Sequence, residues 1–290
     1  MRQEKFQGEG AREPSSLPPP PDPLPQPHNG GGEGSLRGAL PSAAPALINP
    51  VRETGEEAVA GRVVLACTRP DFQLVSRLMG AKQPPRQVWG CGVRSGVWQN
   101  RPLTLAGPVL GAPFAAMVLE KLIALGARAV VVLGWCGSLQ PSVPVGSLVL
   151  PRGAVGGDGT SPHYCLTGSQ LAPHPGLYAS LEKFLVQSLE GEIAWQAGMV
   201  WTTDAYYRET VELVRHCQQL DLLAVDLELA ALLAVGSFRG VAVAALLAVS
   251  DELFGGRWRP GQRSPRLRQA REAAAQAALA ALVEWDEHHA

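Results

Sequence analysis

The chain has 290 residues, of which 46% are hydrophobic, enough for one large α/β domain and a tail or for two small domains. Its formal net charge of −1, without a dense basic patch, argues against nucleic acid as a partner. No apolar run reaches the roughly 18 residues of a membrane span, and the N-terminal residues contain no apolar signal core. We therefore expect a cytoplasmic protein that has no membrane partner.

The five cysteines are scattered along the chain without a CxxC pair, at Cys67, Cys91, Cys136, Cys165 and Cys217. This pattern is typical of a reducing compartment and argues against a disulfide framework or a zinc site. We expect no metal in this protein.

Residues 1–46 do not have the composition of a folded domain. Ten of the 25 prolines lie there, together with the run Gly30-Gly31-Gly32. Such a segment has too little apolar surface to offset the entropy lost on ordering. We predict a disordered Pro/Gly-rich tail at 1–46, either a solvated linker or a partner-binding segment, and a folded domain at 47–290.

Strands and helices alternate in the first half of the folded domain. The unbroken apolar run 130–133 is typical of a strand covered on both faces. Gly134 and Gly137 predict a sharp turn after it, where a ligand can approach the backbone closely. A second strand is expected at 146–151. The other strands are expected at 62–67, 87–93, 96–100 and 102–106, and the helices at 70–79 and 113–125.

The same alternation continues to the end of the chain. We expect helices at 171–189, 208–220, 227–238 and 264–287, and strands at 194–203, 222–225 and 241–249. Ser264 is a plausible N-cap of the last helix and Pro265 its first residue. The fold class is therefore a single three-layer α/β domain with a central mixed β-sheet flanked by helices. Ligands of such sheets bind at the carboxyl ends of strands.

Two acidic sites stand at the ends of apolar strands. Asp226 and Glu228 follow the strand 222–225, where a carboxylate can accept hydrogen bonds from the vicinal hydroxyls of a ribose. Equally, either residue can complement the dipole of the next helix. Asp251 follows nine apolar residues, and burial can raise its pKa so that it acts as a general acid. Capping of the next turn by Ser250 or Asp251 is the alternative.

Several polar and aromatic residues lie in predicted loops. His163 can contact a hydroxyl or simply lie on the surface. Tyr206 and Tyr207 can stack on a flat base, but neighbouring residues face different ways, so we expect at most one to do so. The Arg257-Trp258-Arg259 run after Gly255-Gly256 predicts a loop that either closes over a ligand or is solvated.

The order of five separated blocks is more specific than any single residue. The chain resembles the nucleoside phosphorylase family of the uridine and hexameric purine nucleoside phosphorylase type through PFAAMVLEKLIALGARAVVVLGWCGSLQPSVPVGSLVLPRGAV, DGTSPHY, VWTTDAYYRET, LAVDLELAALLAV and VSDELFGG. Methylthioadenosine/S-adenosylhomocysteine nucleosidases share that fold. The resemblance covers about residues 60 to 285. It implies a catalytic domain that cleaves the N-glycosidic bond of a nucleoside in purine salvage, assembled as a homo-oligomer (a dimer or hexamer).

The resemblance also assigns roles to individual residues. It implies that Glu228 holds the ribose hydroxyls, above an apolar floor at Leu227, where the family usually has methionine. It implies that Asp251 protonates a purine leaving group at N7 and that Tyr206 stacks on the base. The remaining substrate-binding positions that it implies are Gly134, Trp135, Cys136 and Gly111. It implies no cofactor, with inorganic phosphate as the co-substrate.

The residues expected to bind phosphate depart from the family pattern. Cys67 stands at a family glycine, Asp71 near a family arginine, and Val132 or Leu133 at another arginine. A dianion held without paired arginines or clustered N–H donors binds poorly. Arg69, Arg86 and Arg94 are candidate replacements. Because nucleosidases of this fold activate water with a carboxylate in the first loop, Asp71 is the candidate for that role.

The sequence therefore predicts cleavage of a purine-type nucleoside at an altered phosphate site, with two alternatives. Pyrimidine-specific relatives place a glutamine and an arginine just after the stacking aromatic, whereas this chain has Tyr207-Arg208-Glu209-Thr210. One alternative is a nucleosidase that uses water instead of phosphate. The other is a non-catalytic nucleoside-binding protein that kept the pocket and lost the nucleophile site.

Overall fold

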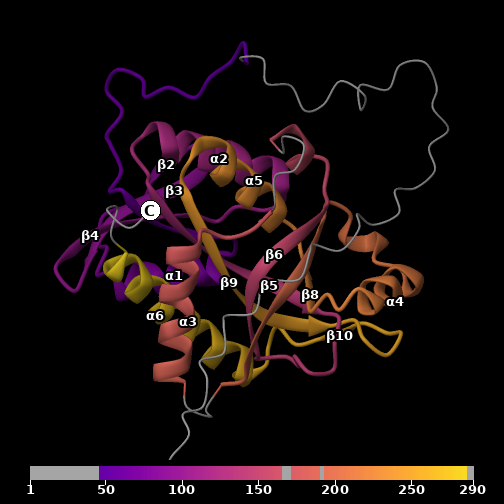
Figure 1. Cartoon of the computed structure of the whole chain (residues 1–290). Helices are drawn as coiled ribbons and strands as arrows, with labels where there is room; N and C mark the ends of the chain where they lie inside the picture. The colour runs from indigo at the N-terminus through magenta and orange to yellow at the C-terminus, as the bar shows by residue number, and fades with distance from the viewer. Residues whose placement is uncertain (1–45, 165–170, 190–192, 286–290) are drawn as a thin grey trace, which may run out of the picture.

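The computed structural model describes residues 46–164, 171–189 and 193–285, so nearly all of the predicted tail lies outside the described residues. The described chain is an α/β domain in which helices cover both faces of a mixed sheet (Figure 1). The strands are β1 (Arg62–Ala66), β2 (Arg86–Val88), β3 (Cys91–Trp98), β4 (Arg101–Gly107), β5 (Ala129–Ser138), β6 (Leu148–Gly157), β7 (Trp195–Thr203), β8 (Ala224–Asp226), β9 (Ala242–Glu252) and β10 (Arg259–Pro260).

Six α-helices and two short 3-10 helices connect these strands in the described chain. The α-helices are α1 (Arg69–Leu78), α2 (Ala112–Ala124), α3 (Pro175–Ser188), α4 (Val211–Gln219), α5 (Leu229–Arg239) and α6 (Pro265–Glu284). The 3-10 helices are Ser161–His163 and Tyr206–Arg208. Ser264 caps α6 by accepting a hydrogen bond from the Arg266 N–H at 3.2 Å, and Pro265 is its first residue, as predicted.

The sheet is partly closed on itself. Its strands follow the order β10-β9-β6-β7-β8-β5-β1-β4-β3-β2, and β9 also pairs with β5. This extra pairing joins β5, β8, β7, β6 and β9 into a ring. Strands β1, β5 and β9 are parallel to one another, while β8 and β6 run antiparallel to β5 and β9, respectively. The predicted mixed sheet is confirmed.

The predicted glycine turn after residue 133 is wrong. Strand β5 continues through Gly134 and Gly137 to Ser138, with one irregularity in its pairing to β9 between Cys136 and Gly137. Strand β9 is also longer than predicted, so Asp251 lies inside the strand. Pairing on both sides overrides the preference of glycine for turns, because neighbouring strands satisfy the backbone N–H and C=O groups.

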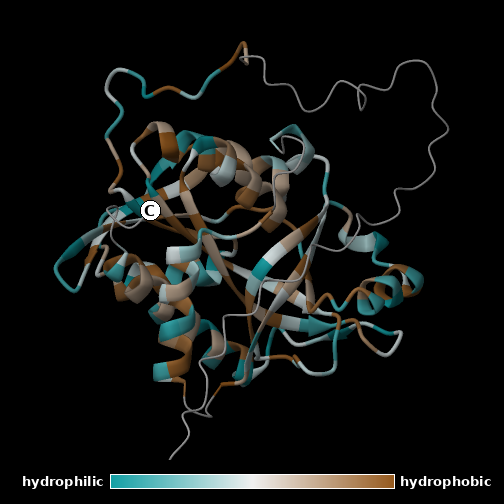
Figure 2. Cartoon of the chain, viewed as in Figure 1, coloured by the Kyte–Doolittle hydropathy of each residue, from teal (hydrophilic) through white to brown (hydrophobic). Residues whose placement is uncertain are grey.

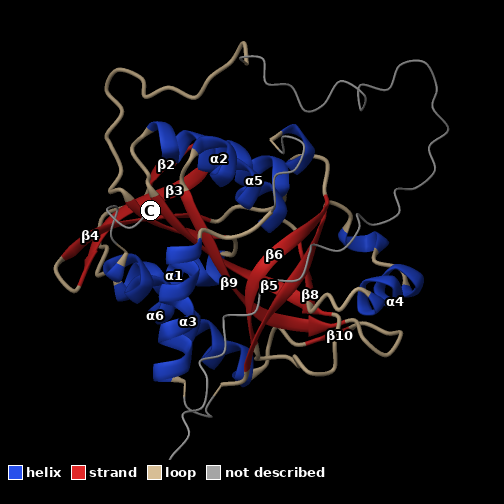
Figure 3. Cartoon of the chain, viewed as in Figure 1, coloured by secondary structure: helices blue, strands red, loops and turns tan. Residues whose placement is uncertain are grey.

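Helices lie on both faces of the sheet (Figure 3), and a layer of buried hydrophobic residues packs between each face and its helices. Alternate residues of β5 face opposite layers: Val130 and Val132 pack towards α2 and α5, and Val131 and Leu133 towards α3 and α6. Helix α6 presents a stripe of buried small residues that allows close approach to the sheet: Ala270, Ala273, Ala274, Ala277, Ala278 and Ala281. Figure 2 shows α5 and β9 as mostly hydrophobic and the outer turns of α3 as hydrophilic.

None of the helices in the described ranges combines the length and apolarity needed to cross a membrane.

We expect Leu279→Ala to lower the free energy of unfolding by about 2–5 kcal/mol, because Leu279 is fully buried and the change leaves a cavity. Urea denaturation should show a lower midpoint with an unchanged slope. Val186→Ala, at a 57% exposed position on α3, is the control and should change stability by less than about 0.5 kcal/mol. Equal effects of the two changes would contradict the packing of α6.

Candidate active site

A cavity of about 250 Å³ lies where the carboxyl ends of β5, β8 and β9 meet. It is lined by residues from seven separate segments: Cys67, Thr68, Leu110, Trp135, Cys136, Gly137, Tyr206, Glu209, Val225, Asp226, Leu227, Glu228, Ser250, Asp251 and Gln262. Of the residues singled out in the sequence, the cavity brings together Asp251, Glu228, Leu227, Tyr206, Trp135 and Cys136. Asp71, Gly134 and Gly111 do not line it.

Gly137 allows the site to assemble. It pairs with Val225 of β8 on one side and with Asp251 of β9 on the other. A Cβ atom at this position would collide with Leu253 and would lie 3.3 Å from both Asp251 Oδ2 and Val225 Cγ1. Because glycine has no Cβ, Asp251 of β9 and strand β8, which leads to Glu228, can both pack closely against β5.

Asp226 has a structural role at the start of α5. Its Oδ2 accepts hydrogen bonds from the backbone N–H groups of Glu228 at 3.0 Å and Leu229 at 2.7 Å. Its Oδ1 accepts one from Thr202 Oγ1, which in turn accepts from the Ala230 N–H. These contacts satisfy the first N–H groups of the helix and hold a charge at its positive end. Asp226 thus takes the helix-terminal role, and Glu228 remains available to a ligand.

Glu228 is 4% exposed and lies beside the loop that precedes α2. Its Oε1 accepts a hydrogen bond of 2.7 Å from the Gly111 N–H. Gly111 has a φ of +83°, so glycine suits this position. Gly111 therefore does not line the cavity but orients Glu228 through this hydrogen bond. Burial, and then the negative charge of Asp226, raise the pKa of Glu228 to about 8.

Asp251 is 5% exposed and has two hydrogen-bond donors. Ser250 Oγ donates to its Oδ1 at 2.6 Å, and Trp258 Nε1 donates to its Oδ2 at 2.9 Å. Burial raises the pKa of Asp251, and the two donors lower it. Asp251 caps no helix or turn in this arrangement. The Trp258 contact was not predicted, although the run around Trp258 was considered as a loop over a ligand.

The two adjacent tyrosines point in different directions. Tyr206 lines the cavity and is 40% exposed, whereas Tyr207 is 93% exposed. Glu209 also lines the cavity, and burial and the charge of Asp251 raise its pKa to about 7. Sequence reasoning used Glu209 only to argue against a pyrimidine and missed its place in the lining. His163 is exposed and lies outside the lining.

Asp71 forms a buried ion pair next to the cavity. Arg271 Nε of α6 donates to Asp71 Oδ1 at 2.6 Å, and Thr68 Oγ1 donates to Asp71 Oδ2 at 2.7 Å. The Arg271 guanidinium also lies over the Trp135 ring, 5.4 Å from its centre. The Asp71 carboxylate therefore has both oxygens engaged. Arg271 was missed because 200 residues separate the two partners in the sequence.

The three arginines predicted as replacements for the phosphate site do not line the cavity. Arg86 donates to the Glu57 carbonyl at 2.8 Å, Arg94 donates to the Ala81 carbonyl at 2.9 Å, and Arg69 is exposed. The lining residues include four acids, Glu209, Asp226, Glu228 and Asp251, and no lysine, arginine or histidine. No group of three or more His, Cys, Asp or Glu in the described ranges is arranged to hold a metal ion.

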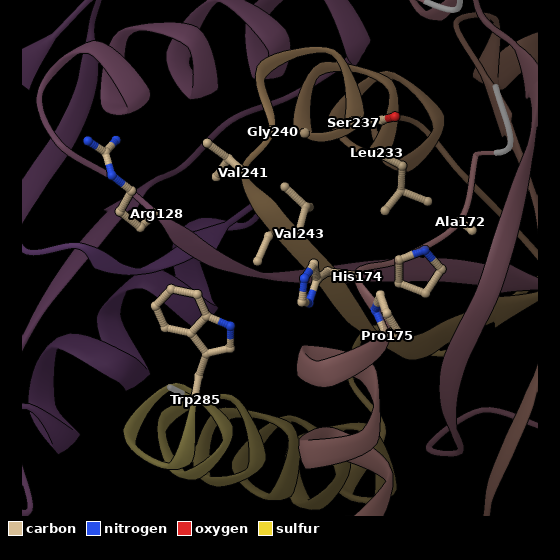
Figure 4. A pocket seen from close by; sticks show the side chains of 13 residues that line it. Arg128, Ala172, His174, Pro175, Leu233, Ser237, Gly240, Val241, Val243 and Trp285 are labelled. Carbon is tan, nitrogen blue, oxygen red and sulfur yellow. The ribbon is translucent and has the colours of Figure 1, made fainter. Parts of the chain in front are cut away.

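A larger cavity of about 600 Å³ lies at the opposite ends of β5 and β9. Figure 4 shows the side chains of His174, Val243 and Trp285 facing a common space there. Its lining contains Arg128 but no carboxylate. It therefore lacks a carboxylate that could accept hydrogen bonds from ribose hydroxyls, and the smaller cavity, with four such acids, is the candidate active site.

Glu228→Gln should make the protein more stable at pH 8. The folded-state pKa of Glu228, about 8, lies above the ordinary value of 4.5, so ionisation disfavours the folded state as pH rises between these values. The Tm of the variant should exceed that of the wild type at pH 8, and the difference should vanish below about pH 4.5. Glu272→Gln, at an exposed position on α6, is the control. Parallel Tm curves for the wild type and Glu228→Gln would contradict the prediction.

Comparison with known proteins identifies relatives of the chain. A guanosine phosphorylase of Halorubrum lacusprofundi is 29% identical over 154 residues, which are 53% of this chain and 63% of that protein. A DeoD-type purine nucleoside phosphorylase of Bacillus cereus is 26% identical over 163 residues, 56% of this chain and 68% of that protein. The chain thus aligns with under two thirds of the length of the guanosine phosphorylase.

Solved structures share the fold. A uridine phosphorylase of Vibrio fischeri complexed with 6-hydroxy-1-naphthoic acid superposes with a TM-score of 0.70 at 24% identity, covering 78% of this chain and 93% of that one. A purine nucleoside phosphorylase of Toxoplasma gondii in complex with immucillin-H gives 0.69 at 20% identity, covering 80% and 97%. The phosphorylase superfamily model matches residues 62–284. The family predicted from the five sequence blocks is confirmed, and the chain belongs to the phosphorylase superfamily.

Proposed function

We propose that the chain cleaves the N-glycosidic bond of a purine-type nucleoside. The observation that carries the proposal is the meeting of Asp251, Glu228 and Tyr206 in one cavity of about 250 Å³. Tyr206 offers a ring face to a flat base. Glu228, when ionised, accepts hydrogen bonds from ribose hydroxyls above the apolar side chain of Leu227. Asp251 is the acid for the leaving base.

The chemistry follows from the charges in the cavity. Protonated Asp251 gives its proton to a ring nitrogen of the base while the bond from C1′ of the sugar breaks and its electron pair leaves with the base. The sugar acquires positive charge in this step, and nearby carboxylates stabilise it. Burial raises the pKa of Asp251, which increases its protonated fraction. The names of the guanosine and purine nucleoside phosphorylase relatives support a purine base.

A second candidate, hydrolysis by water, is favoured by the charges of the lining residues. The four acids of the lining disfavour entry of a phosphate dianion, and Asp71 already neutralises the nearby Arg271. We infer that phosphorolysis needs cations from a second subunit of a homo-oligomer. Without them, water is the nucleophile.

Product analysis with a nucleoside panel separates these functions. Purine and pyrimidine nucleosides, including 5′-methylthioadenosine, are incubated with and without phosphate, and base release is measured. A sugar 1-phosphate formed only with phosphate supports phosphorolysis, and a free sugar at equal rates in both buffers supports hydrolysis. Nucleosides that bind without turnover would contradict the enzyme proposal and support the non-catalytic binding protein.

Asp251→Asn should lower kcat/KM for a purine nucleoside about 10²–10⁴-fold, because asparagine fills the same space but delivers no proton. Nucleoside affinity, measured by calorimetry, should change little. The matched control is Asp221→Asn, an exposed turn residue with a φ of +53° that asparagine tolerates. Unchanged turnover in Asp251→Asn would exclude Asp251 as the acid.

The ion pair between Asp71 and Arg271 provides a test of the water-activating role predicted for Asp71. The two side chains are 6% and 16% exposed, so removing either partner strands a charge and should cost about 3–5 kcal/mol of unfolding free energy. We expect Asp71→Asn and Arg271→Met to destabilise the protein similarly, with similar kcat in the folded fraction. A large loss of kcat in Asp71→Asn alone would instead support Asp71 as the base that activates water.

A further inference from the structure

Trp258 lies in the loop between β9 and β10 and contacts Asp251. The proposed function gives this residue no role. The indole Nε1 donates a hydrogen bond of 2.9 Å to Asp251 Oδ2. The loop runs from the end of β9 to β10, whose residue Pro260 pairs with Asp251. The other carboxylate oxygen accepts from Ser250 Oγ. Both oxygens of Asp251 therefore act as acceptors.

The two donors differ in what they allow. A serine hydroxyl rotates and can accept a hydrogen bond as well as donate one, whereas an indole N–H only donates. A proton on Asp251 Oδ2 would point at the indole N–H and would break this hydrogen bond. A proton on Oδ1 can still be donated to Ser250 Oγ, so the contact with Trp258 keeps the proton off Oδ2. It also favours the ionised carboxylate, because an N–H group bonds more strongly to a charged oxygen.

We propose that Trp258 is a positioning residue that holds Asp251 ionised in the empty site and releases Oδ2 when a nucleoside enters. The proposal rests on the proposed function. Release lets Oδ2 take up a proton from solvent and pass it to a ring nitrogen of the base, while the bond to C1′ breaks and its electron pair leaves with the base. Phosphate, or water that loses a proton to solvent, then bonds to C1′ of the sugar. The indole N–H then returns to the carboxylate that remains.

The loop between β9 and β10 holds Trp258 with few apolar contacts. Gly255 and Gly256 have φ values of +81° and +74°, conformations that glycine adopts without strain. Trp258 itself is 55% exposed, so displacing the indole sacrifices little apolar burial. The end of the loop is anchored separately, because Arg259 forms a 3.5 Å ion pair with Glu252 and lies over the Phe254 ring.

The other groups around Asp251 do not replace this donor. Cys136 of β5 faces it as a buried thiol, and Tyr206 and Glu209 face it across the cavity. Glu209 adds negative charge and no cationic residue lines the cavity. Together with Ser250, Trp258 is what stabilises the ionised form, and removing its N–H should raise the pKa of Asp251.

Two pH profiles of Trp258→Phe test the proposal. Turnover needs protonated Asp251, so rates fall as pH rises through its pKa. The profile of kcat/KM reports the free enzyme, and its falling limb should move to higher pH by about one unit. The profile of kcat reports the complex, where the indole has already left, and should not move.

Control variants separate this role from a loss of structure. Trp89→Phe, at a 63% exposed position between β2 and β3 that does not line the cavity, should leave both profiles unchanged. Trp258→Gln supplies an amide N–H and should move the kcat/KM limb back towards the wild type. If the falling limb of the kcat/KM profile does not shift in Trp258→Phe, the proposal is overturned. If the limbs of the kcat/KM and kcat profiles shift equally, the indole does not leave Asp251 when the nucleoside binds.

A measurement that needs no substrate tests the role of Trp258 independently of glycosidic activity. The pH titration of tryptophan fluorescence, taken as wild type minus Trp258→Phe, should show a transition that disappears in Asp251→Asn. A transition in a protein without glycosidic activity would support the contact and reject the enzyme. Glycosidic activity without this transition would reject the role of Trp258 and leave the proposed function standing.

Discussion

The parallel pairing of β5 with β9 is the constraint on which the rest of the structure depends. It aligns the apolar centres of both strands between the two helical layers and closes the ring that includes β6, β7 and β8. The same pairing carries Asp251 to Gly137, opposite Val225. Closure of the ring and assembly of the site are therefore one event. A side chain at residue 137 would disturb both, because the space is already filled by Leu253, Asp251 and Val225.

The site brings together four acidic side chains whose negative charges repel one another. Glu209, Asp226, Glu228 and Asp251 line one small cavity, and burial raises the pKa of each. Such crowding opposes folding at neutral pH and persists here because strands on all sides determine the positions of the residues. The same crowding favours a ligand that gains positive charge as it reacts. Stability and activity thus place opposite demands on these side chains.

Much of the fold could be predicted from the sequence because its signals are local. Apolar runs and helix caps located most strands and helices, and Asp251 and Glu228 were singled out because acids follow buried strands. Contacts between distant segments left no such signal. Gly134 and Gly137 were taken for a turn, since only the partners on both sides show that the strand continues. Arg271 behind Trp135 and Trp258 on Asp251 depend on how α6 and the β9–β10 loop pack, which no local pattern encodes.

The two cysteines of the cavity, Cys67 and Cys136, lie in an unusual electrostatic setting. Both are buried, and burial together with the charges of the neighbouring acids raises their pKa values well above the ordinary range. Oxidants and alkylating reagents attack the thiolate, which is scarce under these conditions. The acids that we propose to bind and protonate a ligand therefore also lower the reactivity of these two thiols. A cavity that admits small molecules can keep two reduced thiols in its wall without becoming a target for oxidation.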